Sequence, residues 1–294
     1  MTLQRREGRV EVPGGRVFYR VVGNGPGTPL LTLHGGPGSG LVSMRPFQAL
    51  GNERPVVFYD QLGCGRSDVP RDPRLWHPAR FVEEIDTLRK ALQLDEVHLV
   101  GHSWGGMLAI DYLLARPSGV KSVVFTNTLA SVATLCDEIW RLVDALPRWA
   151  RDSLRTHRPN ERGGSLRYQL ALAMYRLRHI VRPWHFPNLW PILHSTLVMS
   201  LSPTYAVMWG HDELHATGVL ADWDRVARLS EIEVSALVLA GEYDETTPRL
   251  ARQLASGLQS ARMHILKGCS HLSFFERPRE YMDLVRSFLH THET

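Results

Sequence analysis

The sequence has few cysteines and no long apolar run. Its 294 residues include three cysteines, Cys64, Cys136 and Cys269, which are far apart and form no Cys-x-x-Cys pair. This number and spacing exclude a disulfide framework and a cysteine-based zinc site, and they favour a reducing compartment. No stretch approaches the roughly 20 apolar residues of a membrane helix, and the first residues lack the apolar core of a signal peptide. We therefore expect a cytoplasmic protein that does not associate with a membrane.

A large excess of one charge sign is also missing. Lys and Arg total 34 against 30 for Asp and Glu, a formal net charge of +4. The basic residues form no stripe with interleaved aromatic residues, which argues against a nucleic-acid partner. The sequence has no cluster of metal-ligand spacing, and its glycine-rich turns lack the Lys-Ser/Thr pair of a phosphate loop. It therefore predicts neither a metal nor a nucleotide cofactor, and it carries no signal for an oligomeric state.

Short apolar runs alternate with helical patterns through residues 1–128. Two strand patterns surround Pro13-Gly14-Gly15 and predict a hairpin. Further strands are expected at 30–33, 56–59, 97–100 and 121–127, with helices at 78–92 and 107–116. This alternation predicts an α/β fold with a mostly parallel central sheet and helices on both faces. In such sheets, functional residues gather where the strands end at their carboxyl side.

The pattern changes at residues 129–220, which show helical spacing and no convincing strand. We predict that this segment is a helical cap inserted between two parts of one core, 1–128 and 221–294. Ten arginines crowd part of it: Arg141, Arg148, Arg151, Arg155, Arg158, Arg162, Arg167, Arg176, Arg178 and Arg182. We interpret them as a solvated helix surface, with a docking face for an acidic partner as the alternative.

The sheet pattern resumes after the cap. Strands are expected at 236–240 and 262–266, and an amphipathic helix is expected at 278–290. Between the two strands, Thr247 precedes Pro248 in the way that an N-cap precedes the first residue of a helix.

The most informative segment is Gly101-His102-Ser103-Trp104-Gly105, which lies between a predicted strand and a predicted helix. Strand, sharp turn and helix are the context in which Gly-x-Ser-x-Gly presents a nucleophilic serine. The two glycines are needed because a Cβ there would crowd the neighbouring strand or helix. We therefore predict that Ser103 is a nucleophile at the helix N-terminus, where unpaired N–H groups favour negative charge.

A nucleophilic serine needs a base, and the base needs a carboxylate that orients it and stabilises its cation. On this scaffold the acid and then the base follow the serine along the chain, each after a late strand. Asp244 follows strand 236–240 and is the candidate acid, whereas His271 follows the last strand and is the candidate base. Poorer candidates precede a strand, adjoin its end or lie within an element: Asp222, Asp224, Glu242, His264 and His290.

The reaction also needs hydrogen-bond donors for the developing oxyanion. One is the N–H of Trp104, directly after the nucleophile, and the other is expected from the loop His34-Gly35-Gly36-Pro37-Gly38. The adjacent glycines allow the N–H of Gly36 to point into the site. We interpret His34 as a brace for this loop rather than as a base.

Taken together, these segments resemble a known family. The motifs are His34-Gly35-Gly36-Pro37-Gly38, Asp60-Gln61-x-Gly-x-Gly-x-Ser67 and Gly101-x-Ser103-Trp104-Gly105-Gly106, with the late Asp244 and His271. They are similar to those of the proline iminopeptidases (prolyl aminopeptidases), serine peptidases of the α/β-hydrolase superfamily. The likeness extends to Met208-Trp209-Gly210-His211-Asp212-Glu213 and Asp222-Trp223-Asp224, although His211 and Leu214 replace the family's Pro and Phe.

The resemblance implies an α/β-hydrolase fold with a helical cap, and it implies roles for two glutamates. In this family a cap glutamate and a glutamate beside the triad acid hold the substrate's α-ammonium group, and the matching positions are Glu213 and Glu245. Two carboxylates in a partly buried pocket form a strong cation site, and they would reject an N-acylated substrate that leaves both charges unpaired.

The expected activity is a serine aminopeptidase that removes an N-terminal residue, often proline, from short peptides or aminoacyl amides. A rival with the same machinery is an amino-acid amidase, or an amidohydrolase that removes an aminoacyl group from a secondary metabolite. More distant alternatives are an ester or lactone hydrolase, for which Glu213 and Glu245 would be incidental, and a non-catalytic ligand receptor on the same scaffold.

Overall fold

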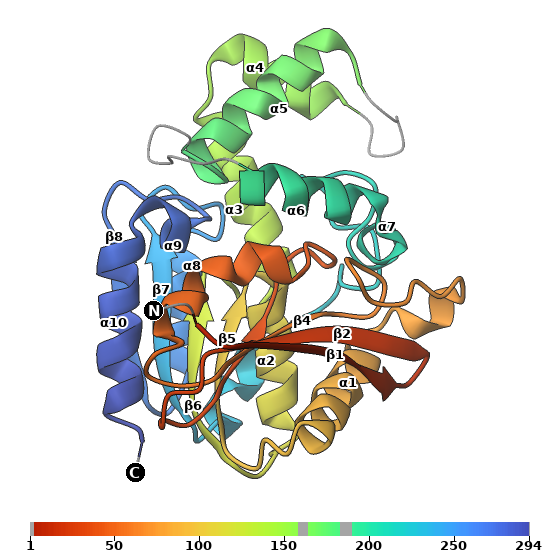
Figure 1. Ribbon diagram of the computed structural model, residues 1–294. Helices are drawn as coiled ribbons and strands as arrows, with labels where there is room; N and C mark the ends of the chain where they lie inside the picture. The colour runs from red at the N-terminus through yellow and green to blue at the C-terminus, as the bar shows by residue number, and fades with distance from the viewer. Residues whose placement is uncertain (1–2, 158–163, 183–189, 294) are drawn as a thin grey trace.

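The core of the protein is an eight-stranded sheet (Figure 1). The structure is a computed structural model, and it describes residues 3–157, 164–182 and 190–293. The strand order is β1-β2-β4-β3-β5-β6-β7-β8. The strands β1 and β2 form the predicted hairpin, β2 pairs antiparallel with β4, and all the other neighbours are parallel. Their bounds are Arg5–Val12, Gly15–Val22, Leu30–Leu33, Val56–Asp60, Val97–His102, Val120–Thr126, Ser235–Gly241 and Ala261–Leu266. The predicted α/β class is confirmed.

Helices cover both faces of the sheet, and this explains why the central strands are mostly apolar in sequence. Every residue of β3, β4 and β5 is buried. Because successive side chains of a strand point to opposite faces, Leu99 and Val100 of β5 belong to two different core clusters. The helices α1 (Pro78–Ala91), α2 (Trp104–Leu114) and α8 (Pro248–Gly257) contribute to one cluster. The other includes η1 (Leu41–Leu50), α9 (Ser273–Glu276) and α10 (Pro278–His290).

Among the described residues, five α-helices lie in the segment expected to form the cap, between β6 and β7. They are α3 (Val132–Asp144), α4 (Arg148–Thr156), α5 (Leu166–His179), α6 (Trp190–Leu201) and α7 (Pro203–Met208). They lie at the top of Figure 1, above one end of the sheet. A β-bridge between Ser131 and Asp224 joins the two ends of this segment, and η4 (Val226–Glu231) then leads into β7. Arg158 and Arg162 of the predicted arginine-rich surface lie outside the described residues.

The predicted start of this helix is confirmed, with Thr247 at the N-cap position and Pro248 as the first residue of α8. The Thr247 side chain, however, makes no capping hydrogen bond. Its hydroxyl instead donates to the buried carboxylate of Glu138 on α3, at 2.7 Å. Glu138 also accepts from Arg141 and Arg249, so the Thr247 hydroxyl donates to a charged group, and such hydrogen bonds are stronger than those between neutral groups. The contact joins α3 to α8.

Within the described ranges, no helix is both long enough and apolar enough to cross a bilayer.

Candidate active site

The turn from β5 to α2 has the strained backbone that the sequence predicts. Ser103 adopts φ 53° and ψ −120°, a left-handed conformation that non-glycine residues rarely occupy. A Cβ on Gly105 would lie 2.0 Å from the carbonyl oxygen of Leu33, and one on Gly101 would lie 2.4 Å from that of Gly105. The turn is also braced by Thr128, whose hydroxyl donates to the carbonyl of Ser103 at 2.7 Å. These contacts hold the Ser103 side chain at the N-terminus of α2.

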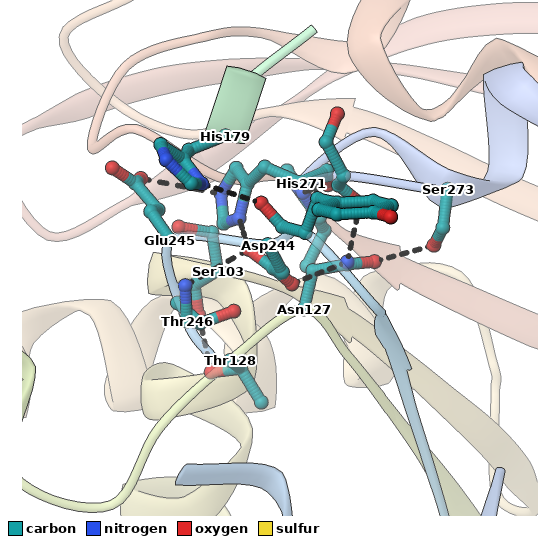
Figure 2. Close-up of polar contacts among 12 residues, drawn as sticks. Ser103, Asn127, Thr128, His179, Asp244, Glu245, Thr246, His271 and Ser273 are labelled. Carbon is teal, nitrogen blue, oxygen red and sulfur yellow. Dashed lines mark hydrogen bonds and ion pairs between the residues drawn. The ribbon is translucent and has the colours of Figure 1, made fainter. Parts of the chain in front are cut away.

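Asp244 and His271 meet beside this turn, although 27 positions separate them in the chain. The His271 Nδ1 lies 2.8 Å from the Asp244 Oδ1, and Figure 2 shows both residues close to Ser103. The buried Asp244 carboxylate also accepts a hydrogen bond from the amide of Thr246 at 2.9 Å. Burial raises the pKa of Asp244, but the charge and hydrogen bond of His271 and the other donors outweigh burial and lower it. Asp244 is therefore held as a carboxylate that faces the imidazole.

Asn127 is a site residue that the sequence reasoning missed. Its Nδ2 donates to the Asp244 Oδ2 at 2.6 Å, and its Oδ1 accepts from the Ser273 hydroxyl at 2.7 Å (Figure 2). Asn127 has φ 49°, a conformation that asparagine tolerates better than most residues. The available signal was its place directly after β6, at the same edge of the sheet as the other site residues. Asn127 positions the acid from the side opposite His271.

The poorer acid and base candidates lie elsewhere. All five are exposed. The Asp224 carboxylate accepts from the amide of Val226 at 2.9 Å, and the Glu242 carboxylate accepts from the amide of Gly268 at 2.8 Å. None of the five lines the cavity that contains Ser103: Asp222, Asp224, Glu242, His264 and His290.

The two predicted oxyanion donors face one cavity. Gly36, with φ 113°, and Trp104 at the start of α2 both line it together with Ser103. Among the described residues, neither the Gly36 nor the Trp104 amide N–H donates a hydrogen bond. Two unused N–H groups next to a serine hydroxyl are the arrangement that an oxyanion hole requires.

Gln61, also missed from the sequence, connects the two loops that carry these donors. Its backbone N–H donates to the His34 Nε2 at 3.0 Å, and its Nε2 donates to the His34 carbonyl at 3.0 Å. The Gln61 Oε1 accepts from the Trp104 indole at 2.8 Å. Burial lowers the pKa of His34 to about 4, so its imidazole is neutral and Nε2 can accept. His34 therefore lies where a brace is expected, and Gln61 sets the distance between the two loops.

The cavity beside Ser103 has two lobes. The smaller lobe, about 60 Å³, is enclosed by apolar side chains that include Leu135, Ile139 and Trp209. The larger lobe, about 230 Å³, is lined by α5, α6 and the loop after β8, and it contains Ser103 and His271. The residues common to both lobes are Gly36, Ser103, Tyr205, Glu213 and Glu245. A ligand at Ser103 therefore has a small space between these apolar side chains on one side and a larger space on the other.

The two predicted glutamates both reach this cavity, but their surroundings differ. The Glu245 Oε1 lies 3.9 Å from the His271 Nε2, and its Oε2 accepts from the Tyr175 hydroxyl at 3.5 Å. Burial, reinforced by the charges of Glu213 and Asp244, raises the pKa of Glu245 to about 7. Glu213 forms an ion pair with Arg176 of α5. Arg176 thus departs from the purely solvated surface predicted for the cap arginines.

The charges around His271 favour its protonated form. Burial lowers the pKa of His271, but the facing Asp244 and then Glu245 and Glu213 outweigh burial and raise it to about 9. An imidazole of this basicity takes up a proton readily. The described residues contain no group of three or more His, Cys, Asp or Glu side chains that could hold a metal ion. The arrangement of Ser103, His271 and Asp244 is suited to nucleophilic attack with proton transfer.

The fold and this arrangement agree with the comparisons to known proteins. The family described as the alpha/beta hydrolase fold matches residues 28–278, so the protein is a hydrolase of this class. A proline iminopeptidase of Heyndrickxia coagulans is 37% identical over 286 residues, which cover 97% of this chain and 99% of the relative. The chain therefore belongs to the proline iminopeptidase family and is an aminopeptidase, which confirms the resemblance inferred from the motifs.

Two solved structures extend this likeness over the whole fold. The crystal structure of the proline iminopeptidase of Mycobacterium smegmatis superimposes with a TM-score of 0.92 at 32% identity, and it covers 98% of this chain and 99% of that one. The crystal structure of VinJ has the same TM-score and the same coverage at 30% identity.

Proposed function

We propose that the protein is a serine aminopeptidase that releases proline or another small apolar residue from the N-terminus of short peptides or aminoacyl amides. The observation that carries the proposal is the joint position of Ser103, the Asp244–His271 pair and two carboxylates, Glu213 and Glu245, at one cavity. The enclosed apolar lobe is a suitable size for a small first side chain. The carboxylates are suited to an α-ammonium group.

In the proposed mechanism the Ser103 Oγ attacks the scissile carbonyl carbon while His271 takes the hydroxyl proton. The N–H groups of Gly36 and Trp104 stabilise the oxyanion. The C–N bond breaks as His271 gives the proton to the leaving amine, and an acyl-enzyme on Ser103 remains. A water molecule then attacks this ester, loses a proton to His271 and releases the amino acid, and the same proton returns to Ser103. Asp244 orients His271 throughout.

The proposal is tested by rates on matched substrates. We would compare the prolyl, alanyl and N-acetyl-prolyl anilides of one chromogenic amine, with a short-chain ester beside them. Fast release from the two free-amine anilides and none from the acetylated one is the expected result. Hydrolysis of the ester alone, or indifference to acetylation, would contradict the aminopeptidase assignment and favour the ester or lactone hydrolase.

Removing the charge of Glu245 should weaken binding of free-amine substrates. Glu245→Gln is expected to raise KM for the prolyl anilide more than tenfold, since a desolvated charge-assisted contact contributes about 2 to 3 kcal/mol. Glu213→Gln should have the same sign and a smaller effect, because Arg176 already neutralises part of the Glu213 charge. Steady-state kinetics with the exposed Glu242→Gln as control checks both. Unchanged KM values in both variants would contradict the assignment of Glu213 and Glu245 as the binding site of the α-ammonium group.

The pH profile gives an independent test. His271 acts as a base only when neutral, with a pKa of about 9, and Glu245 binds a cation only when charged, with a pKa of about 7, so kcat/KM should rise up to about pH 8. Between about pH 8 and pH 9 the gain of neutral His271 is offset because the substrate's α-ammonium, whose ordinary pKa is about 8, loses its proton, and above about pH 9 kcat/KM should fall. In Glu245→Gln the imidazolium loses a neighbouring anion, so the pKa of His271 falls and the rising limb moves to lower pH. A limb that stays in place or moves to higher pH would contradict this.

A further inference from the structure

Arg176 is held over the site by the end of its own helix. Three residues after it, the carbonyl of His179 accepts hydrogen bonds from the amides of Glu245 at 3.3 Å and of His271 at 3.1 Å. The His179 Nδ1 also lies 2.8 Å from the carbonyl of Tyr243. The last turn of α5 is therefore joined to the loops that carry both the candidate acid and the candidate base. A guanidinium one turn before this junction has a defined place relative to Ser103.

The ion pair between Arg176 and Glu213 leaves some hydrogen-bonding atoms of both side chains without a partner among the described residues. Its Nε donates to the Glu213 Oε2 at 2.9 Å, and its Nη2 donates to the same oxygen. Among the described residues, neither the Arg176 Nη1 nor the Glu213 Oε1 makes a hydrogen bond. A guanidinium has five N–H donors, and this side chain is 45% exposed. The Arg176–Glu213 pair therefore presents an unused cationic edge and an unused anionic oxygen side by side.

The two lobes of the cavity differ in which of the charged residues line them. Glu213 and Glu245 line both lobes, whereas Arg176 lines only the larger one. If the first side chain of the substrate occupies the apolar lobe, the leaving group extends into the larger lobe toward Arg176. Consecutive Cα atoms are about 3.8 Å apart, so the ammonium and carboxylate of a dipeptide lie about 5 to 6 Å apart. A dipeptide with its ammonium at the glutamates therefore carries its carboxylate into the lobe that Arg176 lines.

We propose that Arg176 is a specificity-determining residue that binds the carboxylate of the leaving residue, so that dipeptides with a free C-terminus are preferred. This inference rests on the proposed aminopeptidase function and adds the chemistry of its leaving group. A guanidinium suits this task because it pairs with a planar carboxylate through parallel N–H donors. The same residue makes longer or amidated substrates poorer, since they bring no charge to offset its desolvation.

The test compares alanyl-glycine with alanyl-glycinamide, and it uses the alanyl anilide as a third substrate. The native protein should cleave the free acid with a kcat/KM about tenfold above that of the amide. Arg176→Gln should bring this ratio close to one, and it should increase anilide turnover because Glu213 is released for the α-ammonium group. Retained anilide turnover also shows that the variant is folded. The control is Arg178→Gln, an exposed arginine of the same helix that does not line the cavity.

Three other outcomes are distinguishable. If Arg176→Gln lowers kcat/KM equally for the acid, the amide and the anilide, Arg176 only positions Glu213 and the inference is wrong. If the native protein already cleaves acid and amide at the same rate, the inference is wrong while the aminopeptidase function stands. If the native protein cleaves none of the three free-amine substrates, the proposed function fails and the inference fails with it.

Discussion

Replacing Ser103 with alanine is expected to abolish turnover. Loss of the nucleophile in a serine hydrolase of this kind lowers kcat by about 10⁶-fold, and the residual rate comes from the oxyanion donors and binding. The fold should persist because alanine, like serine, carries a Cβ and tolerates the φ of 53° at this position no worse. Prolyl anilide turnover and thermal unfolding by circular dichroism measure the two effects separately.

The control for this substitution is Ser256→Ala, which removes a hydroxyl from an exposed position of α8. It should retain full activity. A serine-reactive organophosphonate adds a second readout, because it should label the native protein once and leave Ser103→Ala unlabelled by mass spectrometry. Turnover by Ser103→Ala above a trace would show that another group is the nucleophile.

Replacing Asp244 with asparagine is the second large effect, a loss of about 10⁴-fold in kcat. The Asp244 Oδ1 faces the His271 Nδ1 at 2.8 Å, and its Oδ2 accepts from the Asn127 amide at 2.6 Å. Both oxygens thus face donors, and a side-chain amide must turn an N–H toward one of them. If that N–H faces His271, the imidazole is held in the tautomer that cannot accept the Ser103 proton. The residual rate should change little with small changes in substrate.

The comparison variants are Asp222→Asn and Asp224→Asn. Both residues are exposed and away from the cavity, and surface substitutions of this kind change stability by about 0.5 kcal/mol or less. We expect kcat/KM within about threefold of the native value for both. A ranking in which either of them costs more than Asp244→Asn would overturn the assignment of the acid.

Most of the fold follows from local patterns. The alternation of short apolar runs and amphipathic helices predicts a parallel sheet because only buried strands are apolar at every position. Strand β5, for example, is continuously buried as expected. Thr247 occupies the predicted N-cap position of α8, but its side chain makes no capping hydrogen bond. Its hydroxyl donates instead to the carboxylate of Glu138, a partner distant in the chain that no local pattern indicates.

Ser103, Asp244 and His271 could be proposed from the sequence since each lies within a few residues of the end of a strand in the parallel part of the sheet. Parallel strands place their carboxyl ends at one edge, so chain order and element type together imply proximity. Asn127 satisfies the same condition and could have been included. Gln61 lies within a recognisable motif, yet its contacts with His34 and Trp104 join three separate loops. Such side-chain pairs depend on loop packing that no local pattern encodes.

The clearest difference between what the sequence determines and what the tertiary structure decides concerns charge in the cavity. Composition, strand pattern and motif spacing were sufficient to indicate an α/β hydrolase, its nucleophile and the glutamates that the family resemblance implies. They could not tell Arg176 from the nine other arginines of the cap segment, because helical periodicity alone leaves open which face meets the core. Only the packing of α5 against the loops of Glu245 and His271 brings this one guanidinium to Glu213. Tertiary structure thereby decides the net charge that a substrate meets, since Coulomb interactions depend on distance in space and not along the chain.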